Sequence, residues 1–468
     1  MKKLYSLLLL TGLLWGRAAS GQTTFQVDTL IKTGPLDQRV NIVFLSDGYQ
    51  TAQLPQFVND VRGVAAGLFA QSPFREYQNY FNVFAIRVPS VDAGAKHPRT
   101  APDCTAMPAA TVNNYFGSSF DQNSIHRLLV ATRASAVAGV LSTHFPLYDQ
   151  AFVLVNTTEY GGGGSTAYAT FSINASSRET CIHEMGHSFA NLADEYWAGP
   201  GYARERANQT AQTDPTLVRW APWVGTGSVG VYPFVENPLW QRPHQNCKMR
   251  YLGSPFCNVC RETFVERIHT LVPPVQSFSP ASTALSDPTA AVPFALTLLA
   301  PSPNTLRVTW QRDGAPLARN TSQVTVPLTA LNTGTHVIRA EVTDTTGFSR
   351  ATTHAAQHTY VTQWTVTNTA TGTHLQASSF EYQLETYPNP VTDALNLSYR
   401  LSRPAPVTVT VLDEAGRRVR TVLQERAAAA GTHQWRFTAA ELGLRRPGTY
   451  RLVLDIDGAR VSRPLVKE

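Results

Sequence analysis

The chain has 468 residues, of which 43% are apolar and 15% charged, so it can form several folded domains and is not a disordered protein. Its net charge is +6, but the surplus lies at the two ends: the first 21 residues hold three basic and no acidic side chains, and the last 82 hold 13 basic and 8 acidic ones. The remainder, with 23 basic and 25 acidic residues, is nearly neutral, which argues against a nucleic-acid partner.

The N-terminus has the three parts of a signal peptide. Residues 1–3 are basic at two positions, residues 4–15 form an apolar run, and residues 17–21 offer small side chains for cleavage. The apolar run is too short for a lasting transmembrane anchor, and no later stretch reaches 18 apolar residues. We expect residues 1–21 to be removed on export, leaving a secreted or surface-attached protein without a transmembrane anchor.

Residues 22–272 mix predicted strands with predicted helices. Apolar runs at 40–45, 80–88 and 150–156 are typical of buried strands, whereas residues 53–70 have apolar side chains at helical spacing. This pattern predicts an α/β (α+β) layered domain.

Two all-β segments follow. Residues 275–372 are rich in Thr, Val, Ser and Pro, with short alternating runs at 305–310 and 336–342, which predicts an Ig-like β-sandwich. A polar linker near 370–379 leads to residues 385–468, again a series of short strands, so we expect a second β-sandwich there.

The segment from Arg178 to Tyr196 carries the strongest motif of the chain. His183 and His187 are four residues apart, so on a helix they lie on one face and can bind one Zn²⁺ at about 2.0–2.1 Å. Glu184 lies beside the first histidine, where it can act as general base towards a zinc-activated water. The motif predicts a catalytic zinc.

A catalytic zinc needs a third protein ligand and an open fourth position. Metzincin-type enzymes take this ligand from a position that is occupied here by Ala193, which cannot bind a metal. On an unbroken helix Asp194 would lie about 10 Å beyond His187, so the helix has to end first. Asn191 tolerates the left-handed turn that this requires. We therefore predict Asp194 as the third ligand, with Glu195 as the alternative.

A glycine run, residues 161–164, precedes a strand-like alternation at 165–172. It could present a sheet edge to which an extended substrate adds as a strand, or it could be a mobile surface loop. No Gly-Lys-Ser/Thr follows, so the run does not predict a phosphate site.

Downstream, Met249 and Tyr251 resemble the Met-turn of metzincins, in which a methionine lies beneath the metal and a nearby tyrosine can reach it. We predict Met249 as this hydrophobic floor and Tyr251 as a candidate catalytic residue. The alternatives are an ordinary core methionine and a packed tyrosine.

The five cysteines are an odd number, so at least one thiol has no disulfide partner. Cys257 and Cys260 form a Cys-x-x-Cys motif that, with Cys247, could supply three ligands of a structural zinc site. In an exported chain a disulfide with one spare thiol is favoured over this site.

Residues 41–49, 73–83, the zinc helix and 247–262 together resemble the IgA peptidase family of zinc metallopeptidases. The resemblance implies a metzincin-like fold and an exported endopeptidase with one catalytic Zn²⁺; it does not imply immunoglobulin A as the substrate. The sequence has no Asp-rich calcium loop, so bound Ca²⁺ stays an open question.

The C-terminal block resembles the sorting domain of type IX secretion. Its signals are Tyr-Pro-Asn-Pro at 387–390, residues 411–416, residues 447–453 and Lys467. The resemblance implies a Gram-negative bacterial host, recognition by the outer-membrane secretion machinery and later removal of the domain. The alternative is a further adhesive β-sandwich.

The leading hypothesis is a secreted zinc endopeptidase that acts on protein or peptide substrates. One alternative is a surface adhesin with a non-catalytic zinc site, in which residues 275–372 bind the partner. Another is a zinc amidase acting on cell-wall peptides. Glu184 argues against the adhesin, because a general base has no purpose in a closed structural site.

Overall fold

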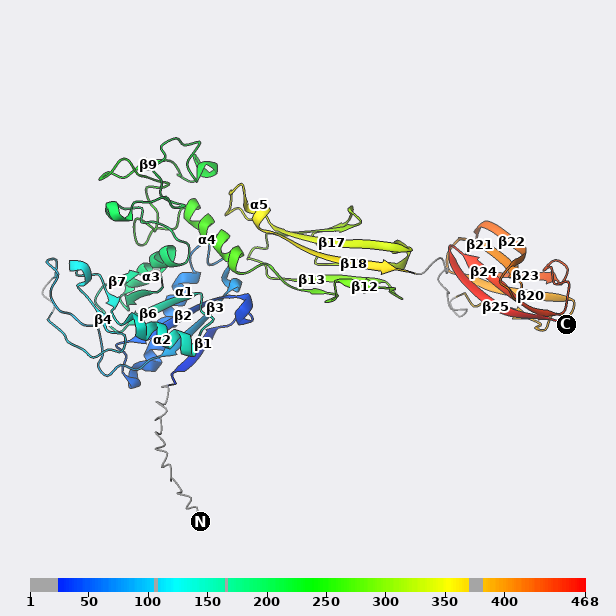
Figure 1. Ribbon diagram of the computed structural model, residues 1–468, viewed down its shortest axis with the longest axis horizontal. Coiled ribbons are helices and arrows are strands. Elements are labelled where there is room, and N and C mark those ends of the chain that lie inside the picture. Colours follow the sequence, from blue (N-terminus) through cyan, green and yellow to red (C-terminus); the bar gives the residue numbers. More distant parts are fainter. Residues whose placement is uncertain (1–23, 105–107, 165–166, 370–381) are drawn as a thin grey trace, which may run out of the picture. The chain divides into compact units, whose positions relative to one another are not determined.

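The computed structural model describes residues 24–104, 108–164, 167–369 and 382–468. The predicted signal peptide and most of the predicted linker lie outside these residues. The chain divides into two compact units (Figure 1): one holds the chain up to Ala284 with residues 291–327 and 336–365, and the other holds residues 285–290, 328–335 and the chain from Val366.

A six-stranded sheet in the order β1-β3-β2-β6-β8-β7 forms the centre of the first unit. Its four inner strands are parallel, and the two edge strands are antiparallel to their neighbours. β2 and β6 are buried along their whole length, as expected for parallel strands covered on both faces. The bounds are β1 (Gln26–Ile31), β2 (Val40–Asp47), β3 (Phe81–Arg87), β6 (Gln150–Val155), β7 (Gly162–Gly164) and β8 (Ala169–Ser172).

Helices cover both faces of this sheet. On one face, α1 (Leu54–Phe69), α3 (Ala175–Ser188) and α4 (Asn258–Leu271) pack against side chains such as Phe44. On the other face, α2 (Ala134–His144) packs against side chains that include Val43. The mixed α/β layering agrees with the predicted class, and β2, β3, β6 and α1 correspond to the elements expected near 40–45, 80–88, 150–156 and 53–70.

Between α3 and α4 the chain is mostly irregular. Its only paired strands among the described residues are β9 (Tyr232–Pro233) and β10 (Gln241–Arg242). A second short pair, β4 (Ser118–Ser119) and β5 (Val130–Ala131), lies earlier in the chain. Because few ladder hydrogen bonds define its path, the segment after α3 depends on side-chain contacts for its shape.

The next part of the chain forms two facing sheets, in the orders β11-β13-β16 and β12-β18-β17-β14-β15. Inside, the rings of Trp310 and Trp364 stack at 5.9 Å. The alternating burial along β13 and β14 agrees with the predicted sandwich. The elements are β11 (Val275–Ser279), β12 (Ala284–Ser286), β13 (Val292–Leu298), β14 (Leu306–Arg312), β15 (Ala315–Arg319), β16 (Gln323–Val326), β17 (Gly334–Asp344), α5 (His354–Gln357) and β18 (Thr359–Asn368).

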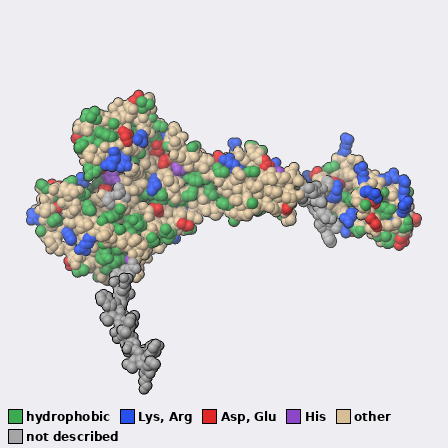
Figure 2. Space-filling view, in the orientation of Figure 1, with side chains coloured by type: hydrophobic (Ala, Val, Ile, Leu, Met, Phe, Trp, Pro, Cys, Tyr) green, Lys and Arg blue, Asp and Glu red, His purple; other side chains and the backbone are tan. Residues whose placement is uncertain are grey.

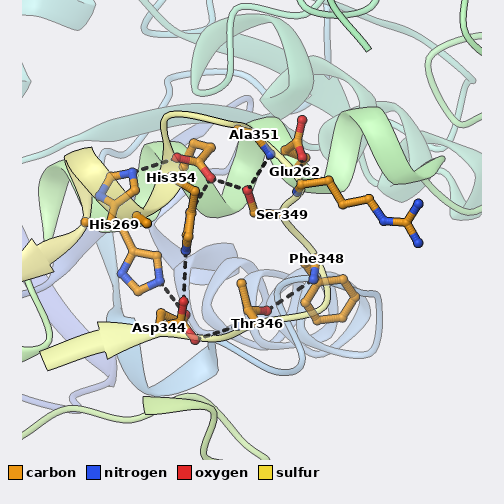
Figure 3. Close-up of polar contacts among 12 residues, drawn as sticks. Glu262, His269, Asp344, Thr346, Phe348, Ser349, Ala351 and His354 are labelled. Carbon is orange, nitrogen blue, oxygen red and sulfur yellow. Dashed lines mark hydrogen bonds and ion pairs between the residues drawn. The ribbon is translucent and has the colours of Figure 1, made fainter. Parts of the chain in front are cut away.

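Polar contacts join this sandwich to α4 within the first unit. The His269 Nε2 lies 2.7 Å from an Asp344 carboxylate oxygen, and both side chains are fully buried. Glu266 binds His354 Nδ1 and His358 Nε2, each at 2.6 Å. Figure 3 shows His269, Asp344 and His354 converging at this contact. The sandwich therefore supports the outer side of α4.

The second unit contains the sheets β19-β20-β23 and β22-β21-β24-β25 around one apolar core. Figure 2 shows Lys and Arg side chains gathered on its surface. No helix in the described part of the chain is long and apolar enough to cross a membrane. The strands are β19 (Glu385–Tyr387), β20 (Ala394–Leu401), β21 (Ala405–Leu412), β22 (Arg418–Ala428), β23 (Gly431–Thr438), β24 (Gly448–Ile456) and β25 (Ala459–Lys467).

Candidate metal and catalytic site

Helix α3 begins and ends where the motif requires. The Asn174 side chain accepts a hydrogen bond from the backbone N–H of Ser176, which caps the first turn. After the last turn Asn191 adopts the left-handed conformation with φ = +54°, and the Leu192 N–H donates to Gly186 O. The helix thus ends before Asp194, and the chain turns back towards the histidines.

Three ligand atoms meet beside α3. Asp194 Oδ1 lies 3.0 Å from His183 Nε2 and 3.2 Å from His187 Nε2, and the two Nε2 atoms are 3.2 Å apart. The opposite ring nitrogens face backbone carbonyls, Lys248 O at 3.0 Å and Leu192 O at 2.8 Å. Since a carbonyl only accepts, each Nδ1 carries the hydrogen and each Nε2 offers its lone pair to the shared point.

Two imidazole lone pairs and a carboxylate that face one point fit a divalent cation, and this donor set suits Zn²⁺. Without a metal, burial disfavours the protonated form of His187, but the Asp194 carboxylate outweighs burial and raises the pKa of His187 to about 9. Burial likewise disfavours the charged Asp194, yet hydrogen bonds from both histidines hold the pKa of Asp194 below its usual range. A metal ion would have to displace a proton here, so metal binding should weaken with falling pH.

The site lies in the wall of a cleft of about 570 Å³. Glu184, the predicted general base, lines this cleft together with His187 and Asp194. Other lining residues come from the loop before β5, from β7 and from the irregular segment after α3, and they include Arg127, Gly162, Gly163, Gly164, Tyr196, Trp197, Arg204 and Arg206.

The predicted glycine run forms β7, the edge strand beside α3. A Cβ atom at Gly164 would lie 2.1 Å from Glu184 Oε2, so glycine is needed for this close approach. At the first end of β7, the Gly162 N–H donates to Arg127 O at 3.1 Å, so this backbone group already has a partner. At the other end, Gly164 is exposed to solvent. The strand therefore reaches the cleft directly next to Glu184.

Met249 lies where the Met-turn pattern predicts. It is fully buried, and a Cβ atom at Gly186, between the two histidines of α3, would lie 2.5 Å from its sulfur. The Glu195 N–H donates to Met249 O at 2.7 Å, which ties this turn to the residue after Asp194.

Tyr251 does not line the cleft: it is 49% exposed, and its ring lies 4.7 Å from the guanidinium of Arg250. The geometry gives its predicted catalytic role no support. Tyr196 lines the cleft instead, with its ring stacked 6.5 Å from that of His183. The sequence analysis missed Tyr196, although its place directly after the two acidic ligand candidates was a usable signal.

Glu195, the alternative third ligand, faces away from the histidines. It is fully buried, and its Oε1 lies 3.3 Å from Cys260 Sγ. Cys260 Sγ is 3.7 Å from Cys247 Sγ and 3.6 Å from Cys257 Sγ. A disulfide requires about 2.05 Å, so the disulfide expected among these cysteines is absent from the structure.

Comparison with known proteins gives few whole-chain relatives. No curated protein matches the chain. Among solved structures, SGBP-B of the mixed-linkage glucan utilization locus of Bacteroides ovatus shares 16% identity over 40% of this chain and 42% of its own, with a TM-score of 0.15. Latent PorU of Porphyromonas gingivalis shares 14% identity over 41% of this chain and 20% of its own, with a TM-score of 0.16. The chain thus spans less than half of either protein, and scores this low support no inference.

Family profiles are more informative. Residues 29–238, which contain α3 and Asp194, match the profile of the IgA Peptidase M64 family. Residues 385–467 match that of the secretion system C-terminal sorting domain. Both matches agree with the resemblances seen in the sequence: residues 29–238 are similar to the IgA peptidase M64 family, and residues 385–467 are similar to the C-terminal sorting domain of type IX secretion.

Proposed function

We propose that this peptidase is a zinc-dependent endopeptidase and that Glu184 is its general base. The observation that carries the proposal is the convergence of two histidine Nε2 atoms and Asp194 Oδ1 within 3.2 Å, in the wall of an open cleft. The buried Met249 beneath α3 supports the metzincin-like part of the fold prediction. It also supports the proposed catalytic domain of residues 22–272, which extends past the matched profile.

His183, His187 and Asp194 would hold the metal, and the Lys248 and Leu192 carbonyls would fix the two rings. When bound, Zn²⁺ supplies Lewis acidity towards the scissile carbonyl and the attacking water. Glu184 accepts the proton of that water and passes it to the departing amine. Tyr196, beside His183 at the cleft wall, is placed to orient the substrate.

The edge strand β7 supports an extended peptide as the substrate. A chain that pairs with the exposed Gly164 end would lie next to Glu184, and backbone pairing of this kind is tolerant of side-chain identity. Arg127, Arg204 and Arg206 line the same cleft, so acidic residues near the cleaved bond should be favoured.

The test compares Glu184→Ala with the wild type on a peptide library read by mass spectrometry. We expect the variant to keep its zinc and to lose about 100- to 10,000-fold of its activity, the usual contribution of a general base. Glu236→Ala, which removes an exposed carboxylate elsewhere in the domain, is the matched control and should keep full activity.

Undiminished hydrolysis by Glu184→Ala would contradict the mechanism. Wild-type protein that leaves every peptide intact but cleaves cell-wall peptides would favour the zinc amidase, and inactivity on both would favour the surface adhesin.

The C-terminal domain indicates interaction with a secretion machinery. We propose that the chain is exported across the outer membrane of a Gram-negative bacterium and that the domain of residues 385–468 is then removed. The C-terminus of the secreted protein, determined by mass spectrometry, tests this, because an intact Glu468 on the mature species would contradict removal.

A further inference from the structure

Four buried side chains that could bind a metal meet on the far side of the Asp194 segment. Glu195 follows Asp194 directly, Cys247 opens the turn that contains Met249, and Cys257 and Cys260 lie at the start of α4. Each is at most 6% exposed, and one ligand atom from each lies within 4.8 Å of the others. The Cys-x-x-Cys spacing is a common one for zinc ligands.

The distances in this cysteine cluster fit a tetrahedral zinc. With Zn–S bonds of about 2.3 Å, two thiolates on one tetrahedral zinc lie about 3.8 Å apart. The measured Sγ–Sγ distances are 3.7 and 3.6 Å. A thiolate and a carboxylate oxygen would lie about 3.6 Å apart, and Glu195 Oε1 is 3.3 Å from Cys260 Sγ and 4.0 Å from Cys257 Sγ. The four ligand atoms all lie within 4.8 Å of one another, and the four distances above are close to those expected around one tetrahedral zinc.

The Glu195 carboxylate lacks a partner for one of its two oxygens, and a cation would supply it. Asn208 Nδ2 donates to Oε1 at 3.2 Å, but the buried Oε2 has no hydrogen-bond partner. Such an atom is costly in a protein interior, and a positive charge in contact with the carboxylate would remove the cost. The backbone N–H of Cys257 also donates to Cys247 Sγ at 3.3 Å, a hydrogen bond that a metal-bound thiolate can accept.

The polar cluster of Glu266, His354 and His358 differs from the cysteine cluster, because its polar atoms have partners within the protein. Both oxygens of Glu266 accept hydrogen bonds from histidine side chains. The remaining nitrogens of His354 and His358 also have partners, Asp344 O and the Tyr360 hydroxyl. That cluster is complete without a metal, whereas the cysteine cluster is not.

The geometry points to a second metal site: Cys247, Cys257, Cys260 and Glu195 bind a structural zinc in a closed, four-ligand arrangement. It takes no substrate, since all four ligands come from the protein and are buried. The zinc would act on the cleft by fixing the position of two chain segments that carry or contact the cleft ligands. Glu195 fixes the chain next to Asp194, and Cys247 fixes the turn whose next residue, Lys248, accepts the hydrogen bond of His183.

The test is cobalt substitution of the full-length chain, read by thiolate-to-cobalt charge-transfer absorption, with zinc counted per chain before the exchange. The double variant His183→Ala/His187→Ala destroys the cleft site but keeps all four proposed ligands. We expect it to lose one zinc equivalent relative to the wild type and to keep the full charge-transfer band. Absence of the band from this variant and from the wild type would overturn the inference.

Cys260→Ser should lose the band and one zinc equivalent, whereas Cys181→Ala, a buried cysteine of α3 outside the cluster, should keep both. If Cys260→Ser does not fold, the histidine double variant decides alone. Thiol titration of the denatured wild type with a chelator is an independent check: all three cluster cysteines should react, and two that react only after reduction would reveal a disulfide and overturn the site. Neither readout depends on peptidase activity, so failure of this inference is separate from failure of the proposed function.

Discussion

The two ligand clusters of the peptidase domain share the segments around residues 194–195 and 247–249, yet they face different surroundings. The cleft cluster offers two imidazoles and one carboxylate, and the side chain of His187 is 28% exposed. The cysteine cluster offers three thiols and one carboxylate, and none of its members is more than 6% exposed. Three ligands in an open wall leave room for a substrate, whereas four in a closed one do not.

Consecutive acids produce this difference. Asp194 contacts the histidines while Glu195 contacts Cys260, so the two neighbouring carboxylates point to opposite sides of the chain. The cysteine cluster is therefore well placed to fix the backbone that presents Asp194. The comparison teaches that the position of a short irregular segment can be fixed when its side chains make contacts on both sides of the chain.

The largest expected effect comes from exchanging the two acids separately. Asp194→Ala should lose the cleft metal. Removal of a residue that only hydrogen-bonds to a metal ligand costs roughly 10- to 100-fold in activity, and the loss in Asp194→Ala should be larger than this. Glu195→Gln should keep the cleft metal and much of the activity, because it acts only through the backbone. Zinc content and hydrolysis rates of both variants are the measurement, and the reverse pattern would exchange the two assignments.

Removal of metal should separate the clusters in time. A chelator at neutral pH should take the metal from the exposed cleft first, so activity falls to background while zinc remains in the protein. The buried cysteine cluster should release its metal more slowly, together with the appearance of reactive thiols. Parallel time courses of activity, zinc and thiol reactivity measure this, and simultaneous loss of all three would break the distinction between an open and a closed site.

A smaller effect is expected from the edge strand. In Gly164→Ala the new methyl group would lie 2.1 Å from Glu184 Oε2 and push the carboxylate aside. Since a misplacement of about 1 Å can cost up to about 100-fold in rate, we expect a 10- to 100-fold lower kcat with unchanged zinc content. Gly67→Ala in α1, where a methyl group meets no atom within 4 Å, is the control. A kcat equal to that of the wild type would separate β7 from the catalytic step.

The smallest effect concerns the metal-free polar cluster under α4. Burial favours the neutral carboxyl of Glu266, but hydrogen bonds from His354 and His358 outweigh it and hold the pKa of Glu266 below the ordinary value of 4.5. The hydrogen bond to Glu266 in turn raises the pKa of His354 above 6.5. Glu266 therefore stabilises the fold above about pH 4.5 and loses this effect as pH falls, whereas His354 contributes below about 6.5 and loses its effect as pH rises.

Glu266→Gln should accordingly lower the free energy of unfolding by about 1.5–3 kcal/mol, the range for hydrogen bonds to charged groups. The loss should be greatest between pH 4.5 and 6.5, and zinc content should not change. Thermal unfolding across this pH range is the measurement. Glu341→Gln, which breaks a half-buried ion pair with Arg339 in the same sandwich, is the control and should cost less, because solvent screens this pair more than the buried contacts of Glu266. A pH-independent difference would contradict the linkage.

Sequence reasoning succeeded where the signal is local. The four-residue spacing of His183 and His187 and the left-handed turn at Asn191 follow from helix geometry, and they predicted the approach of Asp194 to the histidines that the structure has. Its role as the third metal ligand stays a prediction. It was weaker where residues from separate segments meet. It singled out Tyr251 and assigned no role to Tyr196, and it expected a disulfide among cysteines that the structure keeps apart.

By itself, the sequence determined the strands near 40–45, 80–88 and 150–156, the helix near 53–70, the helical spacing of His183 and His187, the two family resemblances and the alternation of the β-domains, because each depends on a period or motif within a few residues. Only the tertiary structure decided which acid faces which cluster, that Glu195 joins Cys247, Cys257 and Cys260, and that the sandwich braces α4. Those contacts join residues up to 92 positions apart in the sequence. No local periodicity encodes such a path, because side-chain packing sets it.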